Sequence, residues 1–368
     1  MRKLASIREI KELYPIKGKD RIELAVIDGW SVIVKKGEYE IGDKTIYCEI
    51  DSMLPEKPEF EFLRNKKFRI KTMKMGGVIS QGICFTLSIL PEGKYDLNDD
   101  VTDLIGIKKY ESQSEKEDCD RSVKNKINNP ILKYLLKYKI FRKLLLSKKE
   151  NKGFPTFIKK TDETRIQNIP HTLKNKDMKY VVREKVDGTS STFCLRKKKS
   201  KLFWIKDSYE YIVCSRNMRL WTKNMSKSYW KVSEKYEIEN VLKKLLESHF
   251  IREDWIAIQG ECVDTNVQGN KYKVKEADLY VFNLITSSGK VDCRVGEILL
   301  KDCNIKWCPL VEENYTLPDT IKEIEDFSTG KSKLYDTLRE GLVFRGYTKG
   351  RELSFKAVSP KFLLKNDE

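Results

Sequence analysis

Short runs in which apolar and polar residues alternate dominate the first hundred residues of the chain. The runs at 22–27 and 30–34 are separated only by Asp28 and Gly29. Alternation predicts strands, and an Asp-Gly pair between two of them is a strong signal for a tight hairpin. Further runs lie at residues 45–50 and 81–85. We expect about five short strands over residues 1–106, which favours an OB-like β-barrel, with an SH3-like barrel as the alternative.

The pattern changes between residues 107 and 152. The stretch 111–118 is almost wholly polar, which predicts a linker. Beyond it, Pro130 stands at a suitable first helical position, and apolar residues recur near helical spacing among many lysines as far as Leu145. We interpret the segment as a basic linker with a helical insertion. The helix packs one face on a domain in the first interpretation, and the alternatives are contact with an RNA backbone or with a membrane surface.

From residue 153 onward, runs of strand length alternate with helical periodicity. The spacing of apolar residues over 238–250 predicts an amphipathic helix. Strands are predicted at residues 180–182, 191–195, 255–258, 279–285, 341–345 and 353–358. This alternation indicates a mixed α/β domain over residues 153–368, and it places the whole chain in the α+β class.

Composition narrows the choice of partner and compartment. The 368 residues include 72 Lys and Arg against 55 Asp and Glu, and the formal charge of +17 favours a polyanion such as nucleic acid. The nine cysteines form no CxxC pair, and two histidines offer little for a zinc site or a catalytic triad. We expect no secretory signal and no membrane-spanning segment. The sequence therefore predicts a cytoplasmic protein of a reducing compartment that does not bind membranes.

A Lys-x-Asp-Gly tetrapeptide, Lys185 to Gly188, lies between two predicted strands. In an extended chain Lys185 and Asp187 point to the same side, and Gly188 allows the backbone to approach a ligand closely. The motif thus presents an amine and a carboxylate to one pocket. The alternative is a plain turn, because roughly one or two in ten lysine-rich chains of this length would contain the pattern by chance.

Further candidate residues follow the tetrapeptide in order along the chain. They are Arg216 and Asn217, Glu261, Phe282, Glu340 and Lys356. Each of them alone has an ordinary structural explanation, and for Phe282 a place in the apolar core would suffice. The functional signal lies in the order and spacing of the whole set.

The ordered set resembles the covalent nucleotidyltransferase superfamily of ATP-dependent ligases and mRNA-capping enzymes, whose motifs I, Ia, III, IIIa, IV and V occur in this order. More closely, the chain resembles the two-domain RNA ligases of the Deinococcus and Naegleria type, in which an OB domain precedes an ATP-grasp-like nucleotidyltransferase domain. The resemblance covers nearly the whole chain except the insertion, and it includes residues 1–7, 20–25, 49–52, 58–64, 154–155, 160–168, 267–270 and 354–356.

The resemblance implies an ATP-dependent RNA ligase for RNA repair. Such an enzyme joins 3′-OH and 5′-phosphate RNA ends, including nicks in a duplex, through lysyl-AMP and RNA-adenylate intermediates. It implies catalytic roles for Lys185, the nucleophile, and for Lys356 at the α-phosphate. Mg²⁺ or Mn²⁺ would be held through water by Asp187, Glu261 and Glu340. The residues implied to bind AMP or ATP are Glu184, Asp187, Gly188, Arg216, Asn217, Glu261, Phe282, Glu340 and Arg165.

Two further expectations follow from this mechanism. Lys185 has to be a neutral amine to attack phosphorus, so we expect the metal ion and Lys356 to lower its pKa. The residues assigned to ATP lie between Arg165 and Lys356, so we expect the AMP pocket to form from the second domain alone. The barrel is then expected to follow the phosphate backbone of RNA, and the protein to act as a monomer.

Alternative functions come from other classes of protein. DNA ligases and capping enzymes share the lysine motif but place an OB domain after motif V, whereas 12 residues follow Lys356 here. An NAD-dependent ligase would need a different N-terminal module. The non-enzymatic alternative is an OB-type RNA-binding protein with a degenerate nucleotidyltransferase domain. The presence of all the charged motif residues together argues against such decay.

Overall fold

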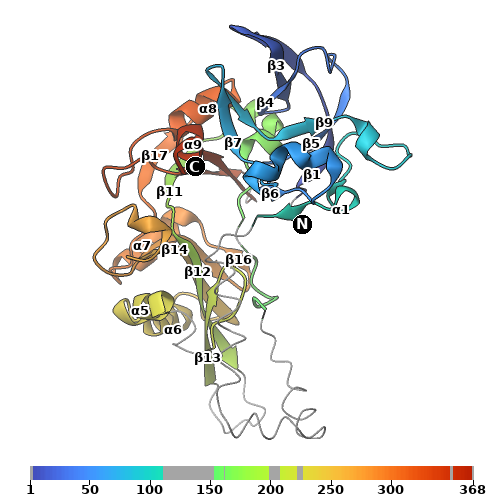
Figure 1. Cartoon of the computed structure of the whole chain (residues 1–368). Helices are drawn as coiled ribbons and strands as arrows, with labels where there is room; N and C mark the ends of the chain where they lie inside the picture. Colours follow the sequence, from blue (N-terminus) through green and yellow to red (C-terminus); the bar gives the residue numbers. More distant parts are fainter. Residues whose placement is uncertain are drawn as a thin grey trace, which may run out of the picture.

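The computed structural model describes residues 3–110, 153–160, 162–198, 208–221, 227–348 and 351–366. These residues form a β-rich N-terminal domain and a C-terminal domain built on two sheets (Figure 1). The predicted linker at 111–118 and the predicted helix that begins near Pro130 lie outside the described residues.

The N-terminal domain consists of short antiparallel strands around an apolar core. Its larger sheets have the orders β1-β5-β9 and β2-β3-β4, and β7-β8 and β6-β10 are two-stranded. The strands are β1 (Ala5–Glu9), β2 (Glu12–Ile16), β3 (Lys19–Ile27), β4 (Trp30–Lys35), β5 (Lys44–Cys48), β6 (Ser52–Met53), β7 (Thr72–Met75), β8 (Val78–Gln81), β9 (Ile83–Phe85) and β10 (Lys108–Lys109). Short helices lie between them at η1 (Pro58–Lys66), η2 (Leu87–Ile89) and α1 (Thr102–Ile105).

Two predictions for this domain can be compared with the structure in detail. Asp28 and Gly29 join β3 to β4 as the predicted tight hairpin, with Asp28 in the left-handed region at φ 51°. The run predicted as one strand over 81–85 is instead divided between β8 and β9. The chain turns at Gly82, whose φ of 118° is an angle that residues with a side chain rarely adopt. A side chain would also not fit there, since an added Cβ would lie 2.4 Å from the ring of Tyr47. β10 pairs with β6, so this domain continues beyond residue 106.

The C-terminal domain contains a four-stranded and a five-stranded sheet, and every pairing between their strands is antiparallel. The four-stranded sheet has the order β17 (Leu310–Tyr315), β11 (Tyr180–Lys185), β18 (Gly341–Thr348), β19 (Arg351–Val358). The five-stranded sheet has the order β13 (Ser208–Ser215), β12 (Thr189–Lys198), β14 (Trp255–Val263), β15 (Asp278–Thr286), β16 (Gly289–Lys290). The chain passes from the first sheet to the second between β11 and β12.

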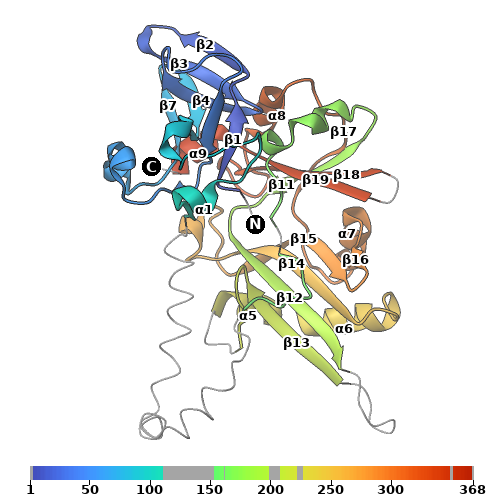
Figure 2. The ribbon, with the colours of Figure 1, turned by 90° about the vertical axis from the view of Figure 1, so that its right-hand side faces the viewer.

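Helices cover the outer sides of these sheets. Helix α6 (Ile238–Ser248) contacts β12 and β14, as its apolar face predicts, and ends two residues before the predicted end (Figure 2). The other helices are α5 (Lys227–Lys235), α7 (Cys293–Lys301), α8 (Ile321–Ser328), α9 (Pro360–Asn366), η3 (Ile166–Asn168), η4 (Pro170–Lys174) and η5 (Gln268–Asn270).

Polar and apolar contacts join the two domains. Trp30 Nε1 donates a hydrogen bond to Asn168 Oδ1 at 2.8 Å, and Asn168 Nδ2 donates to Glu49 Oε1 at 2.8 Å. Gly29 lies so close that an added Cβ would be 2.7 Å from the Cα atom of Gln167. Leu363 of α9 packs against the apolar core of the N-terminal domain. The C-terminal domain is therefore in direct contact with the barrel through η3 and α9.

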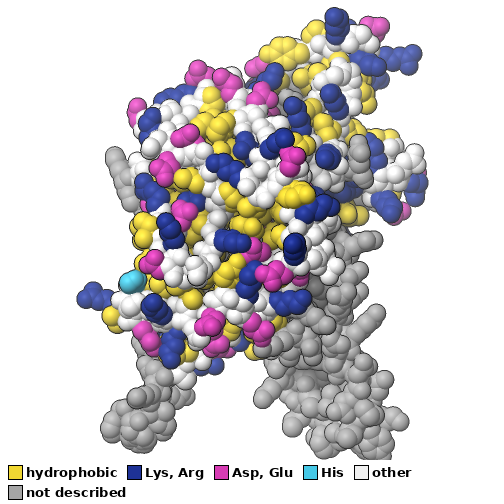
Figure 3. All heavy atoms as spheres, turned by 90° about the vertical axis from the view of Figure 1, so that its left-hand side faces the viewer, with side chains coloured by type: hydrophobic (Ala, Val, Ile, Leu, Met, Phe, Trp, Pro, Cys, Tyr) yellow, Lys and Arg dark blue, Asp and Glu magenta, His cyan; other side chains and the backbone are white. Residues whose placement is uncertain are grey.

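The surface charge is distributed over both domains. On the face drawn in Figure 3, Lys and Arg side chains alternate with acidic ones and form no single continuous patch.

The described cysteines are all free thiols. Within the described ranges, no helix combines the length and the apolar character needed to cross a lipid bilayer.

Candidate active site

The Lys-x-Asp-Gly motif forms the connection between the two sheets of the C-terminal domain. Lys185 is the last residue of β11, and Thr189 is the first residue of β12. A Cβ added to Gly188 would lie 2.5 Å from the carbonyl oxygen of Cys262, so no larger residue fits without movement of the backbone. This glycine therefore allows a close approach of the motif to β14 of the same domain.

Glu340 lies beside Lys185 because Gly341, the next residue, pairs with Lys185 across the sheet. Lys185 Nζ donates to Glu340 Oε2 at 2.5 Å, and both side chains are mostly buried. Burial lowers the pKa of Lys185, but the carboxylates of Glu340 and Glu261 outweigh this effect and raise it above its ordinary value. The expected lowering of this pKa therefore requires added positive charge near these carboxylates.

Three carboxylates surround the amine of Lys185. The pKa of Glu261 is raised to about 8, chiefly by burial; the charge of Lys185 opposes the rise, and those of Glu340 and Asp187 add to it. The pKa of Asp187 is also raised, first by burial and then by Glu340. Such mutual repulsion in a mostly buried site fits a hard divalent cation. Among the described residues, no group of three His, Cys, Asp or Glu is placed to hold a metal ion directly.

Lys356 approaches the pocket from β19, where it pairs with Val343. Its Nζ donates to Asp162 Oδ1 at 2.8 Å. Burial lowers the pKa of Lys356 to about 8, and the positive charges of Arg165 and Lys185 act in the same direction. Lys356 and Lys185 are therefore close enough to influence each other electrostatically.

Arg165 lies at the contact between the two domains. Its side chain is 7% exposed, its Nη2 is 3.5 Å from Asp51 Oδ2, and its guanidinium carbon is 5.9 Å from the centre of the Trp30 ring. The backbone beside it is bound to the last strand, since the N–H of Lys356 donates to Thr164 O at 2.8 Å. Arg165 is therefore an assigned residue of the C-terminal domain that also contacts the barrel.

Arg216 and Asn217 directly follow β13, which ends at Ser215. The charge of Arg216 acts on Glu261 and opposes the rise of its pKa. Asn217 Oδ1 accepts a hydrogen bond from Lys160 Nζ at 3.3 Å. The structure thus brings Arg216 near the carboxylates and leaves the Asn217 amide nitrogen available.

Phe282 is the one residue of β15 that is not fully buried. It lies at a β-bulge, where the register between β14 and β15 shifts after Gln259. Its carbonyl oxygen accepts a hydrogen bond from Arg345 Nη1 at 2.5 Å, which links β15 to β18 of the other sheet. Part of the Phe282 side chain packs in the apolar core, and the rest of its surface is accessible. Core packing alone therefore does not account for this residue.

Glu184 has a different environment from the other assigned residues. It is 1% exposed, and its carboxylate accepts hydrogen bonds from Ser332 Oγ at 2.5 Å and from the backbone N–H of Lys333 at 2.8 Å. Its side chain already fixes the 332–333 segment beside the motif.

Two residues that the sequence analysis did not select contact the motif directly. Lys271 Nζ donates to Asp187 Oδ2 at 2.5 Å, and the hydroxyl oxygen of Tyr272 accepts from the backbone N–H of Asp187 at 2.8 Å. They directly follow the segment 267–270, which resembles the family. That position was the only signal for them, because a lysine and a tyrosine in a loop carry no pattern of their own.

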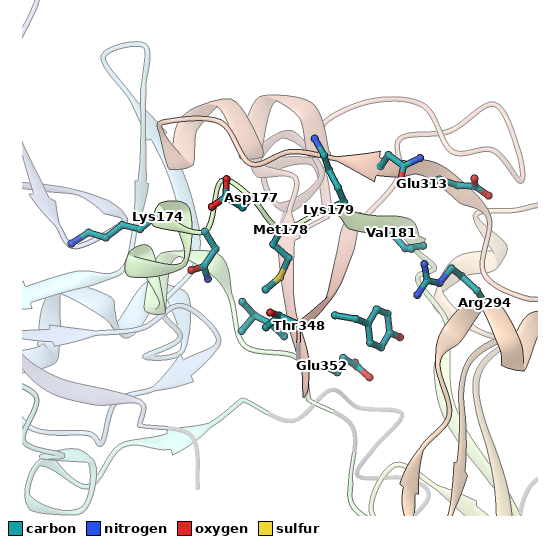
Figure 4. A pocket seen from close by; sticks show the side chains of 13 residues that line it. Lys174, Asp177, Met178, Lys179, Val181, Arg294, Glu313, Thr348 and Glu352 are labelled. Carbon is teal, nitrogen blue, oxygen red and sulfur yellow. The ribbon is translucent and has the colours of Figure 1, made fainter. Parts of the chain in front are cut away.

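A separate cavity lies near the opposite end of β11 (Figure 4). It has a volume of about 670 Å³, and Lys179, Val181, Arg294, Tyr347 and Glu352 are among the residues that line it. Lys185 ends β11 and none of the sequence-selected site residues lines this cavity. It is therefore distinct from the site around Lys185.

The comparisons with known proteins agree on both domains. An OB-fold domain family matches residues 4–87, and the RNA ligase family matches residues 178–358. The OB-like prediction is therefore confirmed over the SH3-like alternative. No curated protein sequence matches this chain.

Solved structures match over almost the whole length. Naegleria gruberi RNA ligase with PPi is 30% identical, with a TM-score of 0.78 and coverage of 100% of this chain and 99% of that chain. A variant of the same ligase with ATP and Mn is 29% identical, with a TM-score of 0.77 and coverage of 99% of each chain. Another variant with AMP and Mn is 30% identical, with a TM-score of 0.77 and coverage of 99% of each chain.

Proposed function

Because this chain belongs to the RNA ligase family and is an ATP-dependent RNA ligase, we propose that it joins RNA 3′-OH and 5′-phosphate ends. Its substrates include nicks in a duplex, and the reaction passes through a covalent Lys185–AMP intermediate. The observation that carries the proposal is the position of the Lys185 amine, 2.5 Å from Glu340 and under the electrostatic influence of Glu261, Asp187 and Lys356. Family membership excludes the purely RNA-binding alternative and favours RNA over DNA ligation and capping.

In the first step, the Lys185 nitrogen attacks the α-phosphorus of ATP. A nitrogen–phosphorus bond forms, the bond between the α-phosphorus and its bridging oxygen breaks, and pyrophosphate leaves. Lys185 has to lose a proton first, which the surrounding carboxylates oppose. Asp187, Glu261 and Glu340 would hold Mg²⁺ or Mn²⁺ through water, and this ion supplies positive charge beside the phosphoryl oxygens. Lys356 would stabilise the charge that develops on the α-phosphate.

Nucleotide recognition is assigned to an aromatic side chain and to several polar ones. Phe282 offers a partly exposed ring at a bulge, which suits stacking on adenine. Arg216, Asn217 and Arg165 would bind the ribose or the phosphates. Gly188 keeps the motif turn close to β14, and Glu184 acts by fixing the neighbouring 332–333 segment.

In the later steps, AMP passes to the 5′-phosphate of RNA, and the RNA 3′-OH then displaces it. The barrel offers an exposed cluster of basic residues on β3 and β4, where Arg21, Lys35 and Lys36 lie together and the N–H of Lys36 donates to Arg21 O at 3.0 Å. Such side chains bind phosphates without regard to sequence, which suits an RNA backbone beside the break. We name these three residues the barrel basic cluster.

The central test uses Lys185→Ala. The variant should lose covalent labelling by ATP carrying ³²P at the α-position, as seen after denaturing electrophoresis, because the nucleophile is missing. It should still seal RNA that already carries a 5′-adenylate, since that step uses the rest of the pocket. Lys179→Ala, at the other end of β11, is the matched control and should label normally. Normal labelling of Lys185→Ala would refute the assignment.

A further inference from the structure

A loop after β14 holds the turn of the Lys-x-Asp-Gly motif at three points. Gln268 Nε2 donates to Gly188 O at 3.5 Å, and Tyr272 binds the backbone N–H of Asp187. The third contact is the ion pair between Lys271 Nζ and Asp187 Oδ2 at 2.5 Å. We refer to residues 268–274 as the clamp loop. Two of these contacts are made to backbone atoms of the motif. The third is made to the side chain of Asp187, which has a proposed role in the reaction.

The clamp loop has a defined conformation of its own. Gln268, Asn270 and Lys273 all adopt left-handed backbone angles, with φ of 47°, 49° and 50°. The Asn270 side chain closes the loop, because its Nδ2 donates to Val274 O at 3.0 Å and its Oδ1 accepts from Val274 N–H at 2.8 Å. Tyr272 is 7% exposed and belongs to the domain core. Lys271 is therefore delivered to Asp187 by a preformed loop, and not by a flexible segment.

Contacts to Lys271 strengthen this ion pair. The Lys271 side chain is 23% exposed and that of Asp187 is 13% exposed, so solvent screens the pair less than it would at the surface. Lys271 Nζ also lies 4.4 Å from the centre of the Phe362 ring in α9, within range of a cation–π contact. The protein's own ammonium group thus occupies an oxygen that the proposed function assigns to a hydrated divalent cation.

We propose that Lys271 is a built-in competitor of the divalent cation at Asp187. This inference rests on the proposed function, since it uses the metal role of that carboxylate. Two cations repel each other at one carboxylate oxygen, so the ion binds well only when Lys271 withdraws. The ion pair neutralises Asp187 when no metal ion is bound there, and it sets the metal concentration that the enzyme requires. By linkage, any ligand that draws Lys271 away tightens metal binding by the same factor.

The test measures Mn²⁺ binding to the full-length protein without nucleotide, from the decrease in the electron paramagnetic resonance signal of free Mn²⁺. Lys271→Met should bind Mn²⁺ at least about fivefold more tightly than the wild type, the lower end of typical couplings between sites. Lys271→Arg keeps the charge and should bind as weakly as the wild type. Lys273→Met removes an exposed positive charge from the same loop and is the matched control, with an affinity close to that of the wild type.

A double-mutant cycle locates the effect. In an Asp187→Asn background, Lys271→Met should no longer tighten Mn²⁺ binding, because the shared carboxylate is gone. Unchanged or weaker binding by Lys271→Met would overturn the proposal, as would equal tightening by Lys273→Met or persistent tightening in the Asp187→Asn background. Covalent AMP labelling of the wild-type protein is measured on the same preparation. Absence of labelling would refute the proposed function, while the Mn²⁺ titration would still report on competition at Asp187.

Discussion

Lys185 and Lys356 are two lysines of one pocket whose pKa values shift in opposite directions. The carboxylates of Glu340 and Glu261 raise the pKa of Lys185, whereas burial beside Arg165 and Lys185 lowers that of Lys356 to about 8. The difference arises from the neighbours and not from the residue type. Lys185, the proposed nucleophile, is therefore the more firmly protonated of the two. The proposed first step requires that the charge of these carboxylates be neutralised.

Glu340→Gln tests this requirement at a single oxygen. The change removes the negative charge and keeps the shape, so we expect at least a tenfold loss of AMP attachment to Lys185, on the order of the cost of losing a metal-binding group. Rates of covalent labelling should be measured over a range of Mg²⁺ and Mn²⁺ concentrations. Glu313→Gln, an exposed change in the same sheet, should leave the rate unaltered. Near-normal rates for Glu340→Gln at every concentration would show that the charge serves no metal.

Residue types and spacing were enough to select Lys185, Glu261, Glu340 and Lys356, which the structure brings into one electrostatic cluster. They were not enough to define the use of Glu184, because its partners Ser332 and Lys333 are 148 and 149 positions away along the chain. Lys271 was missed for the same reason, since its contact with Asp187 depends on the conformation of a loop. The spacing of residues along the sequence does not predict contacts between distant segments of the chain.

At the scale of elements, the sequence predicted the buried strands more reliably than the exposed ones. Strands buried on one or both faces, such as β12 and β14, have the patterns expected of them. β17 was not predicted, because half of the residues of this edge strand are exposed and polar and it pairs only with β11. The short helices α5 and α7 were also missed, since each spans nine residues and offers few repeats of the apolar spacing.

Helix α8 provides a prediction about pH. Its half-buried Glu325 accepts a hydrogen bond from Gln167 Nε2 at 2.6 Å, and burial raises the pKa of Glu325 to about 7. A carboxyl whose pKa is higher in the folded state stabilises the protein below its unfolded pKa, and this contribution is lost as the pH rises through 7. Glu325→Gln keeps an acceptor for Gln167 without a charge. The variant should equal the wild type near pH 5 and exceed its free energy of unfolding at pH 8, by on the order of 2 kcal/mol.

Urea unfolding at pH 5 and pH 8 measures this difference. Glu313→Gln, whose side chain is exposed, should follow the wild type at both pH values. If Glu325→Gln lost stability equally at the two pH values, the carboxylate would be ionised in the folded protein at pH 5 and the burial argument would be wrong.

At the scale of the whole molecule, the barrel and the C-terminal domain share a boundary, although we propose separate tasks for them. Asp51 of the barrel contacts Arg165, and Glu49 and Trp30 both bind Asn168. Removal of the barrel would leave these groups without partners and expose Leu363 of α9. Substitutions on the barrel surface are therefore a cleaner way to separate RNA binding from adenylation than truncation is.

Replacement of Lys35 and Lys36 of the barrel basic cluster by Ala tests the assignment of RNA contact. Sealing of nicked RNA should fall several-fold near physiological salt, and the dependence of sealing on salt should become weaker, by a slope of about one or two for two lost phosphate contacts. AMP attachment to Lys185 should stay unchanged. Lys243 and Lys244, exposed on α6, form a matched pair whose replacement should spare both activities. Equal loss of adenylation and sealing in the barrel variant would contradict a substrate-specific role.

Helix α9 connects three parts of the molecule within seven residues. It directly follows β19, which carries Lys356; its Leu363 enters the barrel core, and its Phe362 supports Lys271. In thermodynamic terms, the two domains are not independent, because Leu363 packs against the barrel core while the buried Phe362 contacts Lys271 of the C-terminal domain. Local unfolding of α9 would therefore remove the contact with the barrel and the contact with Lys271 at the same time. The boundary between the domains and the clamp loop would then loosen together.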